Sequence, residues 1–288
     1  QRMKNDEMIT LAKFLAISGI ILPMLPHKNL IPDINLTPYS IWLATVVVSG
    51  ISYLSYLPKR YVFHESGVLV SGIIGGLYSS TATISVLARK SRKASEQEAN
   101  EYVAAMLLAV SMMFLRFMIL ILIFSREIFT SIYPYLLIMS VVAAVVAWFI
   151  HSRHRRSKDM TDESEDEDSS NPLEFKVALI FATLFVVFTV LTHYTLVYAG
   201  TGGLNLLSFV SGLSDITPFI LNLLQNTGSV AVLVVVACSM QAIISNILVN
   251  MFYALFFAGK GSKLRPWILG GFGTVIGVNL VLLLFFYL

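Results

Sequence analysis

The chain has 288 residues, a formal net charge of +3 and a mean hydropathy of +0.77. Apolar residues make up 56% and charged residues 13%, whereas soluble domains average about 45–50% and about 25%. This composition excludes an ordinary soluble domain, makes the lipid bilayer the expected partner and gives no reason to expect a nucleic-acid partner.

Nine blocks that are nearly free of charge follow one another along the chain. They span roughly 8–25, 39–57, 66–88, 103–124, 133–150, 173–199, 203–225, 229–257 and 266–288. A helix needs about 20 apolar residues to cross the hydrocarbon core, and backbone groups in lipid must be satisfied internally. Because alternation with a period of two is absent, the blocks predict an all-α, multi-pass protein of the cell membrane.

The positions of the basic residues argue against nine crossings. If every block crossed, the Lys and Arg residues of the loops would divide nine against ten, contrary to the positive-inside rule. If blocks 66–88 and 203–225 instead enter and leave on one side, only Lys28 and Arg126 remain outside and seventeen fall inside. The charges therefore predict about seven crossings and two re-entrant hairpins.

Both special blocks are interrupted in the middle by small and capping residues. The sequences are Gly-Gly-Leu-Tyr-Ser-Ser-Thr at 75–81 and Ser-Gly-Leu-Ser-Asp-Ile-Thr-Pro at 211–218. Ser, Thr and Asp are favoured helix N-caps and Pro is favoured in the first helical turn, so each block reads as two half-helices. The alternative is a continuous helix in which Gly72 and Gly76 only permit close packing.

The two interrupted blocks also resemble each other. At an offset of 136 residues the matched pairs are Gly67 and Gly203, Gly76 and Gly212, Leu77 and Leu213, Ser79 and Asp215, Thr81 and Thr217, and Ile84 and Ile220. Residues 39–150 and 173–288 are thus predicted to be two copies of one unit, inverted because each crosses three times. Chance similarity between apolar segments is the competing interpretation. Residues 1–38 would form an extra helix and loop, and residues 151–172 a charged cytoplasmic linker.

Asp215 and Arg116 are the ionisable residues that lie deep inside apolar blocks. A charge at that depth is costly unless it is paired or hydrated, so both are functional candidates. Asp215 is also a natural N-cap for the following half-helix. Arg116 has three alternative roles: it neutralises Asp215, binds an anion or extends toward one membrane face.

The remaining candidate ligand-binding residues are polar side chains at the interruptions and on block 229–257. They are Ser79, Ser80, Thr81, Thr217 and Asn246. Half-helix N-termini favour anions, whereas Asp215 with hydroxyls favours a cation, so the metal or other ligand stays open. No catalytic motif and no cofactor-binding motif is present, and we expect neither an enzyme nor a cofactor.

Several segments together resemble the MgtC/SapB family of prokaryotic membrane proteins, specifically the C-terminal domain of unknown function of its longer members. The segments are Leu-Pro-Met-Leu-Pro at 22–26, Leu-Thr-Pro-Tyr-Ser-Ile-Trp at 36–42, Gly-Gly-Leu-Tyr-Ser-Ser-Thr-Ala at 75–82, Leu-Ala-Arg-Lys at 87–90, Met-Phe-Leu-Arg at 113–116, Asn-Pro-Leu-Glu at 171–174, Ser-Gly-Leu-Ser-Asp at 211–215 and Ser-Asn at 245–246. The resemblance implies a link to magnesium homeostasis and an N-terminal membrane domain in the full-length protein. One departure is Asn250, where the family often has Lys.

The function that these features favour is a transporter or channel-like protein for a small ion or polar solute, with its site between the two hairpin tips. The alternative is a membrane regulator that binds a protein partner or lipid without transporting anything. Either function is compatible with a homo-oligomer.

Overall fold

A computed structural model of the chain describes residues 5–61, 67–92, 94, 96–152, 175–225, 230–259 and 262–287. Within these ranges the regular elements are helices, and an isolated bridge joins Ile31 to Ile34. The predicted all-α class is confirmed. Most of the predicted charged linker at 151–172 lies outside the described residues.

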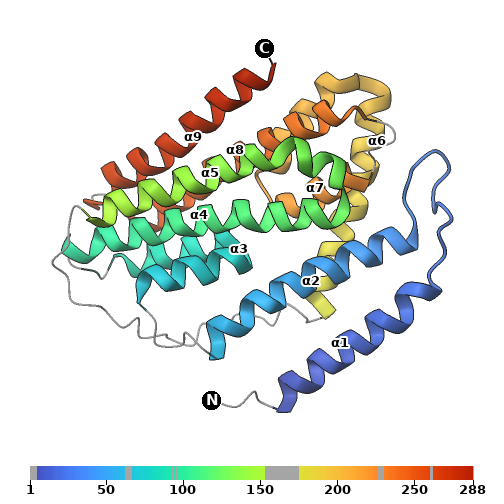
Figure 1. Cartoon of the computed structure of the whole chain (residues 1–288), viewed down its shortest axis with the longest axis horizontal. Helices are drawn as coiled ribbons and strands as arrows, with labels where there is room; N and C mark the ends of the chain where they lie inside the picture. The colour runs from blue at the N-terminus through green and yellow to red at the C-terminus, as the bar shows by residue number, and fades with distance from the viewer. Residues whose placement is uncertain are drawn as a thin grey trace.

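The helices follow the order of the predicted blocks. They are α1 Asn5–Met24, α2 Pro38–Tyr61, α3 Val68–Lys90, α4 Glu96–Phe124, α5 Arg126–Ser152, α6 Phe175–Ser211, α7 Ile216–Gln225, α8 Val232–Ala258 and α9 Arg265–Tyr287 (Figure 1). Among the described residues, six helices are long and apolar enough to cross a membrane: α3, α4, α5, α6, α8 and α9. The chain is therefore a helical membrane protein by the length and composition of its helices.

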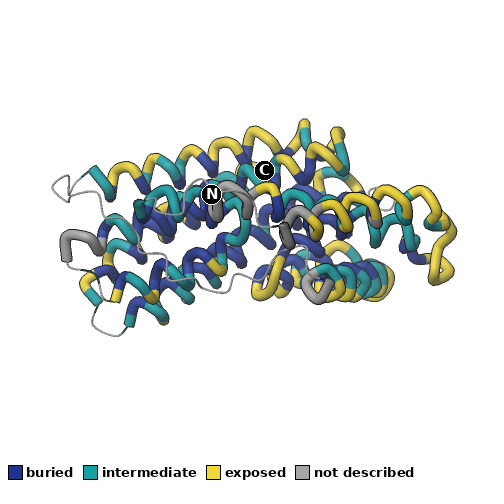
Figure 2. The backbone as a smooth tube through the Cα atoms, turned by 90° about the horizontal axis from the view of Figure 1, so that it is seen from below, coloured by how far each residue is buried: buried dark blue, intermediate teal, exposed yellow. Residues whose placement is uncertain are grey.

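The helices form an elongated bundle with its most buried elements in the middle. Helices α4 and α5 run side by side through it, and α1 packs against α2 at one edge (Figure 1). Buried positions gather inside the bundle and exposed ones on its outer faces (Figure 2). Trp148 is 68% exposed on such a face. Large apolar side chains that face outward in this way suit contact with lipid rather than water.

Helix α3 folds back on itself at Ser79. This residue has extended torsion angles, φ −157° and ψ 106°, inside an otherwise helical segment. A Cβ atom on Gly75 would lie 2.8 Å from Cγ2 of Thr83, although residues eight apart in a straight helix are separated by about 12 Å along the axis. Residues 68–78 and 80–90 are therefore two half-helices that lie against each other, and a continuous helix is the wrong interpretation of this block.

The second interruption has a different construction. Helix α6 is kinked at Gly200, whose torsion angles of φ +59° and ψ −154° are essentially restricted to glycine. The helix then ends at Ser211, and residues 212–215 lead into α7. The break at 211–218 was predicted, and the kink at Gly200 falls between the predicted blocks 173–199 and 203–225.

Equivalent glycines hold both interruptions against the next long helix. A Cβ atom on Gly76 would lie 2.5 Å from Cα of Ala109 in α4. A Cβ atom on Gly212 would lie 2.6 Å from Oγ of Ser245 in α8. Both contacts join residues 33 positions apart, and the same offset of 136 relates Gly76 to Gly212 and Ala109 to Ser245. Gly76 therefore permits close helix packing, as the alternative interpretation held, and the chain is also interrupted beside it.

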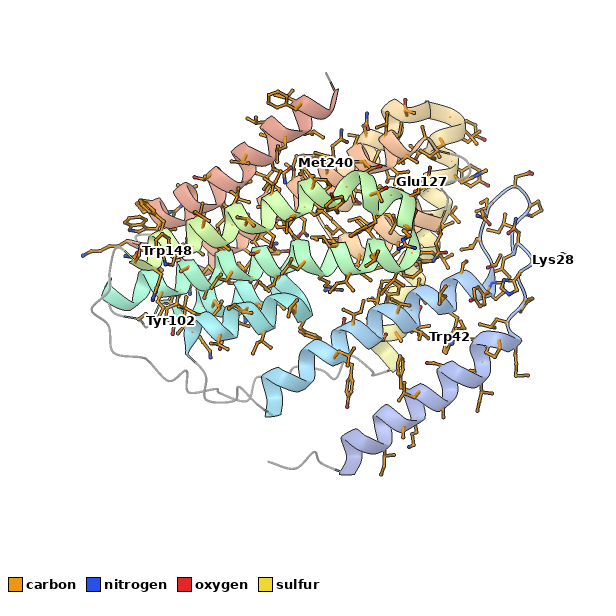
Figure 3. All side chains as sticks on the ribbon, viewed as in Figure 1. Lys28, Trp42, Tyr102, Glu127, Trp148 and Met240 are labelled. Carbon is orange, nitrogen blue, oxygen red and sulfur yellow. The ribbon has the colours of Figure 1, made fainter. Side chains whose placement is uncertain are left out.

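The basic residues Arg92 and Lys263 line one small pocket where the ends of α3 and α8 adjoin. Arg92, after α3, donates from Nη2 to the carbonyl oxygen of Phe256 at 3.3 Å, so the end of α3 adjoins the end of α8. Lys28 and Glu127 lie toward the opposite end from Trp148 (Figure 3).

Candidate functional site

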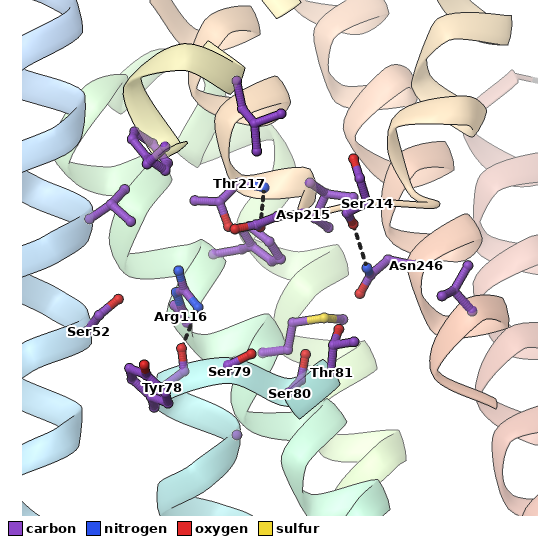
Figure 4. A pocket seen from close by; sticks show the side chains of 18 of the residues that line it. Ser52, Tyr78, Ser79, Ser80, Thr81, Arg116, Ser214, Asp215, Thr217 and Asn246 are labelled. Carbon is purple, nitrogen blue, oxygen red and sulfur yellow. Dashed lines mark hydrogen bonds between the residues drawn. The ribbon is translucent and has the colours of Figure 1, made fainter. Parts of the chain in front are cut away.

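A cavity of about 490 Å³ lies where the two interruptions meet (Figure 4). Its walls come from α2, α3, α4, α6 and α8 and from the segment 213–217. All seven residues singled out in the sequence line it: Ser79, Ser80, Thr81, Arg116, Asp215, Thr217 and Asn246. The fold thus brings together polar residues from both predicted units around one space.

The wall on the α3 side is built at the chain reversal. The amide of Ala82 donates to Oγ of Ser79 at 3.3 Å, so Ser79 caps the second half-helix. At the end of the first half-helix, the carbonyl oxygen of Tyr78 accepts a 2.8 Å hydrogen bond from Nη1 of Arg116. A cation at a helix C-terminus is favourable, because that end carries partial negative charge. Arg116 therefore has a structural partner as well as a place on the cavity wall.

The wall on the α7 side repeats this plan with other residues. The amide of Thr217 donates to Oδ1 of Asp215 at 2.9 Å, so Asp215 caps α7 as predicted. Nδ2 of Asn246, on α8, approaches the carbonyl oxygens of Gly212 at 3.3 Å and Ser214 at 3.4 Å. Ser214 matches Tyr78 at the offset of 136, so each interruption has a carbonyl group bound by a side chain of the following long helix.

Asn250 supports Asn246 from one helical turn away. Its Nδ2 donates to Oδ1 of Asn246 at 3.2 Å, which leaves the amide of Asn246 to donate to the interruption. A lysine at this position would bring a positive charge into the same contact. With Asn250 in that place, the contact is made by a neutral pair of side chains.

Arg116 and Asp215 face the same cavity without forming a direct ion pair. No guanidinium nitrogen lies within 4.0 Å of a carboxylate oxygen of Asp215. Figure 4 shows the guanidinium between the break in α3 and the start of α7. The charge of Asp215 still acts on Arg116, so the cavity contains two attracting charges held apart by their own backbone partners. Neutralisation of Arg116 by direct contact with Asp215 is not what the structure shows.

Burial separates the remaining candidates into two kinds. Thr217 and Ser80 are buried, with exposures of 2% and 7%, and Asn246 is buried at 5%. Ser79 and Thr81 are half-buried, and Asp215 is exposed to the cavity. Asp215 and Arg116 therefore supply the charged surface that a ligand would meet, with hydroxyl groups beside it.

Two serines of α2 belong to the site although the sequence interpretation missed them. Ser49 and Ser52 line the cavity, and both are buried within an apolar helix. Their spacing of three residues places them on one helix face, which was the available signal. Tyr253 of α8 also lines the cavity.

The described residues do not assemble a conventional metal site. Among them, no group of three or more His, Cys, Asp or Glu side chains gathers closely enough to hold a metal ion. Asp215 is the one carboxylate on the cavity wall within this part of the chain. A cation bound there would rely on hydroxyl and carbonyl oxygens for its other ligands.

Comparisons with known proteins place the chain in a family without assigning an activity. An uncharacterized protein of Aquifex aeolicus (strain VF5) is 27% identical over 221 residues, which cover 76% of this chain and 94% of that protein. No solved structure matches. A family described as a domain of unknown function, DUF4010, matches residues 46–258, which include both interruptions and every residue singled out for the site. The chain belongs to this DUF4010 family.

Proposed function

We propose that the protein is a transporter or channel-like protein of the cell membrane that carries a small ion or polar solute through the cavity. The observation that carries this proposal is the meeting of two interrupted helical segments, 136 residues apart, around one polar cavity. Interrupted helices of this kind expose backbone groups and charges near the membrane midplane, where secondary transporters bind their solutes. Polar backbone inside a membrane is tolerated where it lines such a cavity.

In the proposed topology, α3 and the segment 203–225 are re-entrant hairpins and the other long helices make about seven crossings. The return of α3 at Ser79 supports this, because its first and last residues then lie on the same side of the bilayer. Three crossings in each unit would invert the second copy relative to the first. The matched contacts of Gly76 and Gly212 support descent of both units from one sequence.

The resemblance of several segments to the MgtC/SapB family makes Mg²⁺ one of the solutes to test. The single carboxylate in the described part of the cavity wall is a weaker argument for a divalent cation than two or three would be. The alternative function, a regulator that binds a protein or lipid, predicts no movement of solute.

Flux measurements in reconstituted vesicles test the proposal. Purified protein in liposomes should move at least one solute among Na⁺, K⁺, Mg²⁺, Cl⁻ and small polar organic molecules faster than empty liposomes do. Asp215→Asn should abolish that movement, whereas Glu127→Gln, at an exposed position away from the cavity, should not. No protein-dependent flux for any of these solutes would reject transport and favour the regulator.

A further inference from the structure

The two charged groups of the cavity are each held by the backbone and not by each other. Arg116 uses Nη1 to bind the carbonyl oxygen of Tyr78, and its Nε is buried without a hydrogen-bond partner. Asp215 uses Oδ1 to accept from the amide of Thr217. A guanidinium carries five N–H donors and a carboxylate about four acceptor positions, so each group retains most of its capacity to bind a ligand.

Charge balance limits which ligand fits between them. An uncompensated charge inside a membrane protein is costly, and the cost is greater for Arg116, whose Nε is buried, than for Asp215, which is exposed to the cavity. A cation at Asp215 leaves Arg116 without a counter-charge, and an anion at Arg116 leaves Asp215 without one. A ligand that carries both charges compensates both groups and leaves the site neutral.

We propose that the cavity binds a small zwitterion of the α-amino-acid type, with its carboxylate at Arg116 and its ammonium group at Asp215. The guanidinium favours a carboxylate because it offers paired donors, and the free acceptor positions of Asp215 suit the three donors of an ammonium group. The claim that this ligand is transported rests on the function proposed above, whereas the claim that it binds is tested separately.

The size and lining of the cavity agree with a small organic ligand. Its volume of about 490 Å³ falls within the range of about 300–1,000 Å³ that is usual for small-molecule sites and far exceeds what a bare ion requires. Apolar side chains from two helices, Met113, Phe117 and Phe181, complete the lining beside the charged groups. They provide a surface for the hydrocarbon part of an amino acid.

Thermal unfolding of the purified protein in detergent provides the test. The common L-amino acids are added one at a time, with acetate and methylammonium at the same concentration as ligands that carry one charge each. We expect at least one amino acid to raise Tm saturably by about 3 °C or more, and neither single-charge compound to do so. A titration of Tm against concentration gives the apparent Kd.

Two variants test whether the rise in Tm depends on the cavity, and two control variants remove the same kinds of charge elsewhere. Asp215→Asn keeps the helix cap but removes the charge, and Arg116→Gln removes the other charge; each should weaken binding at least about tenfold. Glu127→Gln and Arg126→Met alter adjacent exposed charges outside the cavity and should leave the apparent Kd unchanged. Size-exclusion profiles establish which variants fold. If Arg116→Gln does not fold, the binding measured for Asp215→Asn decides whether the ligand occupies the cavity.

Three results would overturn the inference: no amino acid shifts Tm, acetate or methylammonium shifts it equally, or the shift persists in Asp215→Asn. Binding without flux in liposomes would keep the zwitterion site and reject transport. Flux of an inorganic ion without amino-acid binding would support transport and reject the zwitterion site.

Discussion

Arg116 and Tyr78 connect α4 to the point where α3 reverses direction: Nη1 of the arginine donates to the tyrosine carbonyl oxygen at 2.8 Å. That carbonyl group stands at the end of a half-helix, where carbonyl groups commonly bind partners from outside the helix. The arginine therefore stabilises the reversal and at the same time brings a positive charge to the cavity.

Replacement of Arg116 should reveal the structural part of this double role. Arg116→Met removes the charged donor from the part-buried carbonyl group of Tyr78, so we expect a loss of about 1–3 kcal/mol of unfolding free energy. Arg116→Lys, which retains a donor, should recover part of the loss. Equilibrium unfolding in detergent measures both variants, and equal stability of Arg116→Met and the parent protein would contradict the assignment.

A double-mutant cycle measures the interaction between the two charges. Arg116→Met and Asp215→Leu each leave the opposite charge uncompensated, and the double variant removes both charges. We expect the double variant to be less destabilised than the sum of the two single changes. Strict additivity would show that the charges do not interact across the cavity.

Two substitutions at Asp215 separate charge from capping. Because Asn is as good an N-cap as Asp, Asp215→Asn should leave unfolding free energy nearly unchanged. Asp215→Leu should destabilise the protein by about 1 kcal/mol or more, since the amide of Thr217 loses its acceptor. If Asp215→Asn also retains full flux or ligand binding, then the carboxylate serves only as a cap.

The glycines that hold the two interruptions in place should resist enlargement. Gly76→Ala puts a methyl group against the backbone of Ala109, and Gly212→Ala puts one 2.7 Å from the carbonyl oxygen of Ala242. Overpacking of this kind typically costs about 1–3 kcal/mol, which thermal or chemical unfolding can detect. Gly273→Ala is the matched control because a Cβ atom there meets nothing within 4 Å. Equal tolerance at all three positions would argue against the close approach.

Cysteine labelling in intact cells tests the arrangement of the two ends. In a Cys238→Ala background, an impermeant thiol reagent should label Lys28→Cys and Arg126→Cys but not Ala94→Cys or Lys263→Cys. Ala94 and Lys263 line one small pocket, so they must lie on the same side. If Ala94→Cys is labelled together with Lys28→Cys, then α3 crosses the bilayer and the re-entrant topology is wrong.

The two interruptions were predictable because their causes are local. Paired glycines followed by Ser-Ser-Thr end one half-helix and begin another, and Asp-Ile-Thr-Pro begins α7 for the same reason. The division between blocks 173–199 and 203–225 predicted a break near Gly200, but the choice of Gly200 rather than Gly202 or Gly203 depends on the tertiary fold. The predicted repeat led us to expect that the two interruptions would meet at one cavity. The place of Ser52 on its wall depends on how α2 packs, which the sequence does not reveal.

Direct contact between Arg116 and Asp215 was a reasonable expectation that the fold does not realise. From the sequence they are the two deep charges of opposite sign, and nothing in it reveals that backbone groups at the interruptions bind each of them first. The competing partners, the carbonyl group of Tyr78 and the amide of Thr217, become available only once the helices break.

The matched positions Ser79 and Asp215 cap the two interruptions in the same way but differ in charge. A neutral hydroxyl caps one interruption and a carboxylate caps the other. If the protein alternates between two conformations by exchanging the roles of its halves, then these conformations cannot be equal in free energy. One of them should dominate at rest, and distances between spin labels on the two halves would show a single main population; two equal populations would contradict this.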